Sequence, residues 1–188
     1  GTFALTSLAG GLSGVISGTG SLTMDATGGS ISISGANTYS GTTTISGGTL
    51  QVGTGGTSGN LGTGAVTNNA ALVFNRTDSS TVSGAISGTG TLQQAGTGTV
   101  ILAGANTYTG TTTISSGTLS VTGTLGNTGA GVGTYANTIS NAGVLNINST
   151  GTQTISGIIS GTGALTQSGT GTTILTSANT YSGITTIS

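Results

Sequence analysis

The chain contains the octapeptide SGVISGTG at residues 13–20, and it returns as SGAISGTG at residues 83–90 and as SGIISGTG at residues 156–163. The three copies therefore begin 70 and 73 residues apart. Self-similarity at a fixed period indicates a repeat architecture, in which each unit packs against the units next to it.

A second block has the same periodicity. The sequence ANTYSGTTTIS at residues 36–46 returns at residues 105–115 and 178–188 with one substitution in each copy. These copies begin 69 and 73 residues apart, and the longer interval reflects an insertion before Tyr135. Both blocks thus keep one order and nearly one period along the whole chain.

Within a unit, apolar residues alternate with Ser and Thr, as in SISIS at residues 30–34 and TLQV at residues 49–52. This period of two is typical of half-buried β-strands, and helical spacing is absent. Gly-rich tetrads such as SGTG at residues 17–20 and GTGT at residues 96–99 follow the strands. Because Gly accepts positive φ, these tetrads indicate corners.

Alignment of the units predicts which side chains point inward. The positions that stay apolar are Ile16/Ile86/Ile159, Leu22/Leu92/Leu165, Ile33/Leu102/Leu175, Ile45/Ile114/Ile187, Leu50/Leu119 and Val52/Val121. Short strands with Gly-containing turns are also compatible with an antiparallel sandwich. The long-range repetition favours a stack of coils of roughly 20 to 25 residues, so about three coils per unit.

The predicted fold is therefore all-β, a parallel β-helix (β-solenoid) built from repeats of about 70 residues and roughly three coils each. Residues 1–188 are expected to form a single solenoid segment of a longer chain. The internal repeats are expected at about residues 12–81, 82–154 and 155–188, the last of them incomplete.

The composition fits this architecture and excludes much chemistry. Among 188 residues there are 39 Gly and no Pro, Cys, His or Trp, and the charged side chains are Asp25, Arg76 and Asp78. A disordered chain is usually poor in β-branched residues and highly charged, unlike this one. The apolar runs are too short for a transmembrane helix, so the segment is not expected to span a membrane.

The blocks at residues 35–50 and 104–119 resemble the autotransporter passenger-associated β-strand repeat. In the third copy, Ser177 replaces the leading Gly and Ile184 replaces a Thr. The resemblance implies a right-handed parallel β-helix in the passenger of a large bacterial surface protein, secreted or held at the cell surface. It also implies a linked outer-membrane β-barrel outside this sequence.

Catalytic, cofactor and metal sites are predicted to be absent. Asp25 and Asp78 are the only carboxylates, and a hydrolase needs a base beside its Ser or Thr nucleophile. Calcium-binding β-rolls require an Asp in each turn, and phosphate loops require a Lys. Arg76 alone cannot neutralise a nucleic-acid backbone, so nucleic acid is excluded as a partner.

Two polar columns recur in the repeats. Tyr39, Tyr108 and Tyr181 align, and they would either form an aromatic row for carbohydrate or cover a corner of each unit, which is the favoured interpretation. Asn37, Asn106 and Asn179 stand two residues before them and are expected to stabilise corners.

Other short motifs suggest weaker hypotheses. The Thr triplets at residues 42–44 and 111–113 raise the possibility of ice binding, although they recur once per unit and not once per coil. Asn75 and Asn148 begin sequences that match the N-glycosylation pattern, which arises readily by chance in a chain rich in Asn and Thr.

The function predicted from these residues is a structural stalk or an adhesive passenger segment without catalysis, which extends from the cell and mediates adhesion or autoaggregation. Its expected partners are copies of itself or the surface of a host or neighbouring cell. The alternatives are a self-assembling extracellular filament or matrix protein and a glycan- or ice-binding solenoid.

Overall fold

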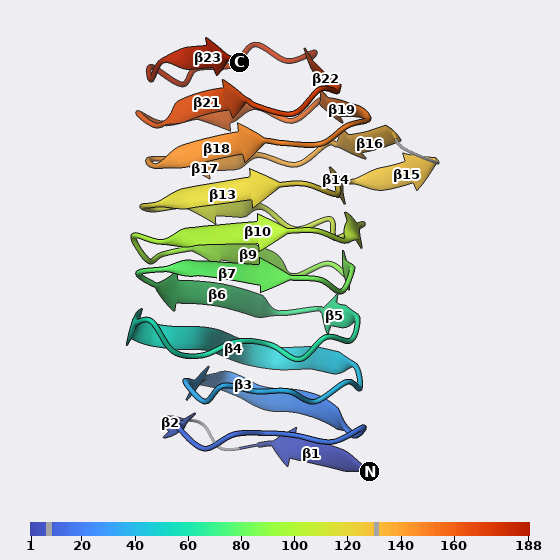
Figure 1. Cartoon of the computed structure of the whole chain (residues 1–188), viewed down its shortest axis with the longest axis vertical. Helices are drawn as coiled ribbons and strands as arrows, with labels where there is room; N and C mark the ends of the chain where they lie inside the picture. The colour runs from blue at the N-terminus through green and yellow to red at the C-terminus, as the bar shows by residue number, and fades with distance from the viewer. Residues whose placement is uncertain (7–8, 130–131) are drawn as a thin grey trace.

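The computed structural model describes residues 1–6, 9–129 and 132–188, and these residues form strands and no helix. The strands stack as a β-solenoid of about nine turns, with about 20 residues between stacked positions. The N-terminus and the C-terminus lie at opposite ends of the stack (Figure 1). The predicted parallel β-helix is confirmed, and the antiparallel sandwich is wrong, because every ladder of the described residues except β15–β16 is parallel.

Each coil contributes three strands, which form three stacks that we call faces A, B and C. Face A contains β6 (Ala71–Arg76), β9 (Thr91–Gln94), β12 (Thr112–Ile114), β17 (Ile139–Asn141) and β20 (Ile159–Ser160). Face B contains β7 (Ser79–Val82), β10 (Thr99–Leu102), β13 (Thr118–Val121), β18 (Val144–Ile147), β21 (Ala164–Gln167) and β23 (Thr185–Ile187). Face C contains β5 (Val66–Asn68), β8 (Ile86–Ser87), β11 (Ala105–Asn106), β14 (Thr124–Leu125), β16 (Val132–Tyr135), β19 (Thr152–Ile155) and β22 (Thr172–Leu175).

The first coils use longer strands that turn the corner between faces C and A. The strand β4 (Thr43–Gly56) pairs with β5 through its first residues and with β6 through its later ones. The strand β3 (Ser21–Ile33) pairs with β1 (Thr2–Leu5) and then with β2 (Ala9–Leu12) in the same way. The extra residues before Tyr135 include β15 (Asn127–Gly129), which pairs antiparallel with β16.

Alternation along each strand fills a narrow aliphatic core. On face A, Leu50 pairs with Leu72, and Leu72 pairs with Leu92, so these side chains stack directly on one another. All three are almost completely buried. Full burial of a Leu side chain stabilises a fold by about 1.5–3 kcal/mol, so a few such residues per coil hold the stack together.

The corners explain the repeated SGTG tetrad. Gly18, Gly88 and Gly161 occupy equivalent positions and have φ of 100°, 101° and 105°. A Cβ added at Gly88 would lie 2.2 Å from the carbonyl oxygen of Asn68 in the preceding coil. Gly is therefore required there both for its positive φ and for the close approach of two coils.

Most of the predicted inward positions are confirmed. Every member of the six apolar columns is buried except Ile16, Leu175 and Ile187. Ile16 and Leu175 are partly buried against the core, whereas Ile187 is 81% exposed. Ile187 pairs with Gln167, which pairs with the buried Ile147, so it keeps the inward register. It is exposed because β23 lies in the last coil, and no described residue covers its outer side.

The sequence columns are not spatial columns. Leu22 pairs with Thr43, Thr43 with Val66 and Val66 with Ile86, so three coil steps carry the chain from residue 22 to residue 86. Leu92, the sequence equivalent of Leu22, comes six residues later and lies on face A instead of face C. Each repeat therefore spans about three and one-third coils.

The next repeat shows the same rotation. Leu92 pairs with Thr112, Thr112 with Ile139 and Ile139 with Ile159, which again completes three coil steps. Leu165, the third member of the Leu22 column, then lies on β21 of face B. Equivalent residues such as Ile86 on β8 of face C and Ile159 on β20 of face A thus both point inward but do not stack in one ladder.

Candidate functional site

The two carboxylates do not form a pair. Asp25 is exposed on β3, whereas Asp78 follows β6, which is two pairing steps further along the stack. Asp78 instead receives hydrogen bonds from Arg76, whose Nε and Nη2 donate to its two carboxylate oxygens at 2.9 and 2.8 Å. The geometry brings no second carboxylate to either Asp.

Arg76 also binds the preceding coil. Its Nη2 donates to the carbonyl oxygen of Thr57 at 2.7 Å, and its Nη1 donates to that of Gly59. Only 9% of Arg76 is exposed, and Asp78 is the partner of its charge. The pairing of Arg76 with Asp78 over two residues is visible in the sequence, but its contact with the segment around Thr57 requires the stack.

The Tyr column lies inside the solenoid. Tyr39 and Tyr108 are each 1% exposed, and their hydroxyl groups lie 2.6 and 2.7 Å from the hydroxyls of Thr43 and Thr112. Tyr181 makes the same contact with Thr185, four residues later, and remains partly exposed. The structure therefore favours the corner-covering interpretation over an exposed row for carbohydrate.

A fourth tyrosine joins this cluster. Tyr135 packs its ring against that of Tyr108 with centroids 5.6 Å apart, and its hydroxyl lies 2.7 Å from that of Thr112. It also donates to the carbonyl oxygen of Gly110 at 2.6 Å. Burial raises the pKa of Tyr135 to about 12 and that of Tyr108 well above its usual value of 10.0. No role for Tyr135 could be predicted from the sequence, because this residue has no counterpart in the other repeats.

The Asn column connects successive coils. The Oδ1 atoms of Asn37, Asn106 and Asn179 accept hydrogen bonds from the backbone N–H groups of Ile16, Ile86 and Ile159 at 2.8, 3.0 and 2.8 Å. The Nδ2 of Asn106 donates forward to the carbonyl oxygen of Thr124 and within its own turn to that of Gly104. The predicted corner role is thus correct, with bonds that reach both neighbouring coils.

A second pair of Asn residues has a similar role that the sequence did not reveal. Asn68 and Asn141 are fully buried, and their Nδ2 atoms donate to the carbonyl oxygens of Thr91 and Ala164 at 2.9 Å. The alignment of Asn68 with Asn141 in the next repeat is the sequence signal that could have identified them.

The Thr triplets do not form a shared surface. Their central residues, Thr43 and Thr112, are buried and bonded to Tyr hydroxyls. Thr43 stacks on Val66 of face C, whereas Thr112 stacks on Leu92 of face A. Of the two possible glycosylation residues, Asn148 is exposed after β18 and Asn75 is half-buried on β6.

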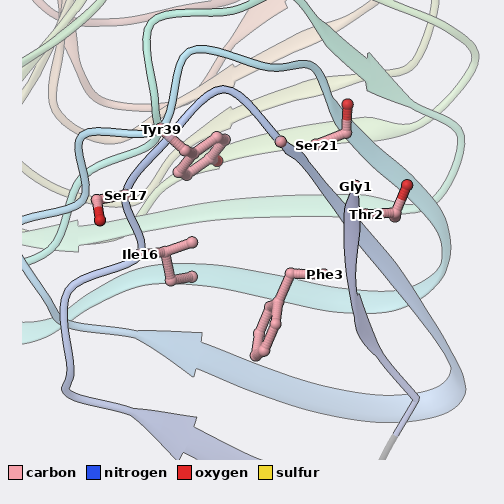
Figure 2. A pocket seen from close by; sticks show the side chains of 8 residues that line it. Gly1, Thr2, Phe3, Ile16, Ser17, Ser21 and Tyr39 are labelled. Carbon is pink, nitrogen blue, oxygen red and sulfur yellow. The ribbon is translucent and has the colours of Figure 1, made fainter.

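The pockets lie mostly where coils end or bend. A hollow near the N-terminus has a volume of about 230 Å³. Phe3, Ile16 and Tyr39 are among the residues that line it (Figure 2). A hollow of about 380 Å³ at the other end is lined by Leu165, Leu175 and Ile187 among others. Neither contains a titratable side chain other than Tyr39, whose hydroxyl is bonded to Thr43.

Three segments of the chain match a known family of repeats. A family model described as passenger-associated-transport-repeat matches residues 17–52, 92–121 and 165–188. The resemblance to the autotransporter passenger repeat is thereby confirmed in these three segments, which together cover just under half of the chain. No curated protein and no solved structure gives a significant match. In the part of the chain that the structure describes, no helix is long and apolar enough to cross a membrane.

Proposed function

We propose that this chain is a structural or adhesive stalk segment in the passenger of a secreted bacterial surface protein, and that it catalyses no reaction. The repeat family and the β-solenoid both fit an autotransporter passenger, and the family implies a secreted or surface-exposed protein. A solenoid whose coils contact mainly their neighbours extends in proportion to its length, which suits a stalk.

The observation that carries this proposal is that the repeated polar side chains form hydrogen bonds within the stack. The repeated Asn and Tyr residues bond neighbouring coils or the interior, as Asn106 and Tyr108 do. A reactive site instead gathers polar groups of perturbed pKa around a cavity that substrate can enter. The groups with raised pKa, Tyr108 and Tyr135, line a hollow of about 340 Å³, but both side chains are almost completely buried and their hydroxyls are bonded to that of Thr112.

Small-angle X-ray scattering on the purified chain tests the stalk. About nine turns at a spacing of about 4.8 Å predict a rod roughly 43 Å long, and duplication of one repeat is expected to lengthen it by roughly 16 Å. A compact particle whose length does not grow with the added repeat would contradict the stalk.

Binding of coated beads tests the adhesive part. Beads that carry the chain are expected to bind bacterial or host cells, or one another, more strongly than beads that carry serum albumin. Equal binding by both kinds of bead would exclude adhesion by this segment, but it would not contradict its role as a stalk. Reproducible turnover of a substrate by independent preparations would contradict the absence of catalysis.

A further inference from the structure

Arg76 is the only Lys or Arg residue in the chain. Proteases of the trypsin class cleave after Lys or Arg, because an Asp at the base of their specificity pocket binds the basic side chain. The peptide bond between Arg76 and Thr77 is therefore the single place at which such a protease can cut these 188 residues.

The side chain that a protease must capture is already bound. All three guanidinium nitrogens of Arg76 donate hydrogen bonds, to Asp78 and to the carbonyl oxygens of Thr57 and Gly59. Charge-assisted bidentate bonds of this kind are among the stronger hydrogen bonds in proteins. An arginine in this arrangement cannot enter a specificity pocket until these bonds open.

The scissile peptide group is held as well. The carbonyl oxygen of Arg76 accepts a hydrogen bond of 2.9 Å from the N–H of Gly98 in the following coil. The N–H of Thr77 donates at 3.0 Å to the carbonyl oxygen of Gly56 in the preceding coil. The carbonyl oxygen and the N–H group of this peptide bond must both align in the protease. Both are instead hydrogen-bonded to neighbouring coils.

The segment that Arg76 contacts lies at the surface. Residues 54–58 are exposed, and the pairing of β4 with β6 shifts register between Val52 and Gly56. The contacts from Arg76 to Thr57 and Gly59 tie this segment to the next coil. Loss of Asp78 would leave the guanidinium buried without its charge partner, which is costly, so the side chain would swing outward.

We propose that Asp78, with the carbonyl groups of Thr57 and Gly59, forms a latch that closes the only cleavage site for trypsin-like proteases. When the latch opens, water adds across the peptide bond between Arg76 and Thr77. The C–N bond breaks, Arg76 gains a carboxylate and Thr77 gains an amino group. The products are residues 1–76 and 77–188.

Limited proteolysis with trypsin, followed by intact mass measurement, tests the latch. The wild-type chain is expected to be cut slowly, and Asp78→Asn is expected to be cut at least tenfold faster into the two stated fragments. Asp25→Asn is the matched control, because it removes the other carboxylate far from Arg76 and is expected to keep the wild-type rate.

General destabilisation is controlled separately. Leu145→Ala weakens the buried core of β18, several coils away, and its cleavage rate at a temperature well below its melting transition is expected to stay below that of Asp78→Asn. If Asp78→Asn does not fold, Arg76→Lys keeps a cleavable residue without the bidentate fork and is expected to show the same acceleration.

Two results would overturn the latch. One is cleavage of the folded wild-type chain as fast as that of the heat-denatured chain. The other is equal rates for Asp78→Asn and Asp25→Asn. Neither result bears on adhesion or rod length, so the latch and the proposed function fail independently.

Discussion

At the scale of single residues, the solenoid depends on which side chains of each strand point into the core and which point outward. Ile86 is completely buried, whereas its neighbour Ser87 is only half-buried and points outward on the same strand. Adjacent side chains on a strand face opposite sides of the sheet, so this contrast follows from the alternation visible in the sequence.

Replacement of these two residues by Asp is expected to have very different effects. Ile86→Asp places a carboxylate without a partner in the aliphatic core, and it should lower the free energy of unfolding by several kcal/mol. Ser87→Asp should cost far less. Denaturant unfolding measures both, and hydrogen exchange should show the coils next to Ile86 loosened more than the chain ends. Equal losses for the two variants would contradict the inward register.

The buried tyrosines predict how stability depends on pH. In the unfolded chain Tyr135 loses its proton near pH 10, whereas in the folded protein its pKa is about 12 because burial disfavours the charged form. The unfolded state therefore binds fewer protons above pH 10, and the stabilisation present below that pH is lost as the pH rises toward 12, by about 2–3 kcal/mol.

Thermal melts from pH 5 to 12 measure this dependence. The melting temperature is expected to change little between about pH 5 and 9, because the chain contains no His or Cys, and to fall above pH 10. In Tyr135→Phe the fall should be shallower, although the variant starts from a lower stability because its bond to Thr112 is lost. A melting temperature that is constant from pH 9 to 12 would contradict the buried cluster.

At the scale of strands and corners, the sequence predicted much of the structure. Alternation in SISIS and the Gly-rich tetrads predicted strands and corners correctly, because both depend on local backbone geometry. The rotation of Leu22, Leu92 and Leu165 onto different faces was not predictable, because an alignment measures the period in residues and not in coils. The partners of Arg76 were hidden for the same reason, since they depend on which segment lies beneath it.

The Asn corners offer a test of the bonds between coils. Asn106→Leu keeps a similar volume but leaves the buried N–H of Ile86 without its acceptor, at an expected cost of about 1–3 kcal/mol. Asn148→Leu, an exposed substitution after β18, is the matched control and should change stability by less than about 0.5 kcal/mol. Similar melting temperatures for the two variants would show that the bond from Asn106 contributes nothing to the stack.

At the scale of the whole molecule, a sequence period of about 70 residues is combined with coils of about 20 residues. Because each repeat advances by about three and one-third coils, equivalent surfaces of successive repeats face in three directions around the rod. A rod of this kind has no single side on which all repeats display the same residues. That arrangement suits a stalk, and it disfavours a flat periodic face built from the Thr triplets.

The pairing of coils is tested most directly by engineered cysteines, since the chain has none of its own. Gln93 and Thr113 are register partners on β9 and β12 and point outward, so Gln93→Cys with Thr113→Cys is expected to be joined rapidly within one molecule by a short bis-thiol reagent. Gln93→Cys with Thr166→Cys is the control, because Thr166 aligns with Gln93 in the sequence but lies on face B, several coils away. Rapid joining of the first pair alone is the predicted result. Failure of the first pair to join in the folded protein, or joining of the second pair instead, would contradict the solenoid.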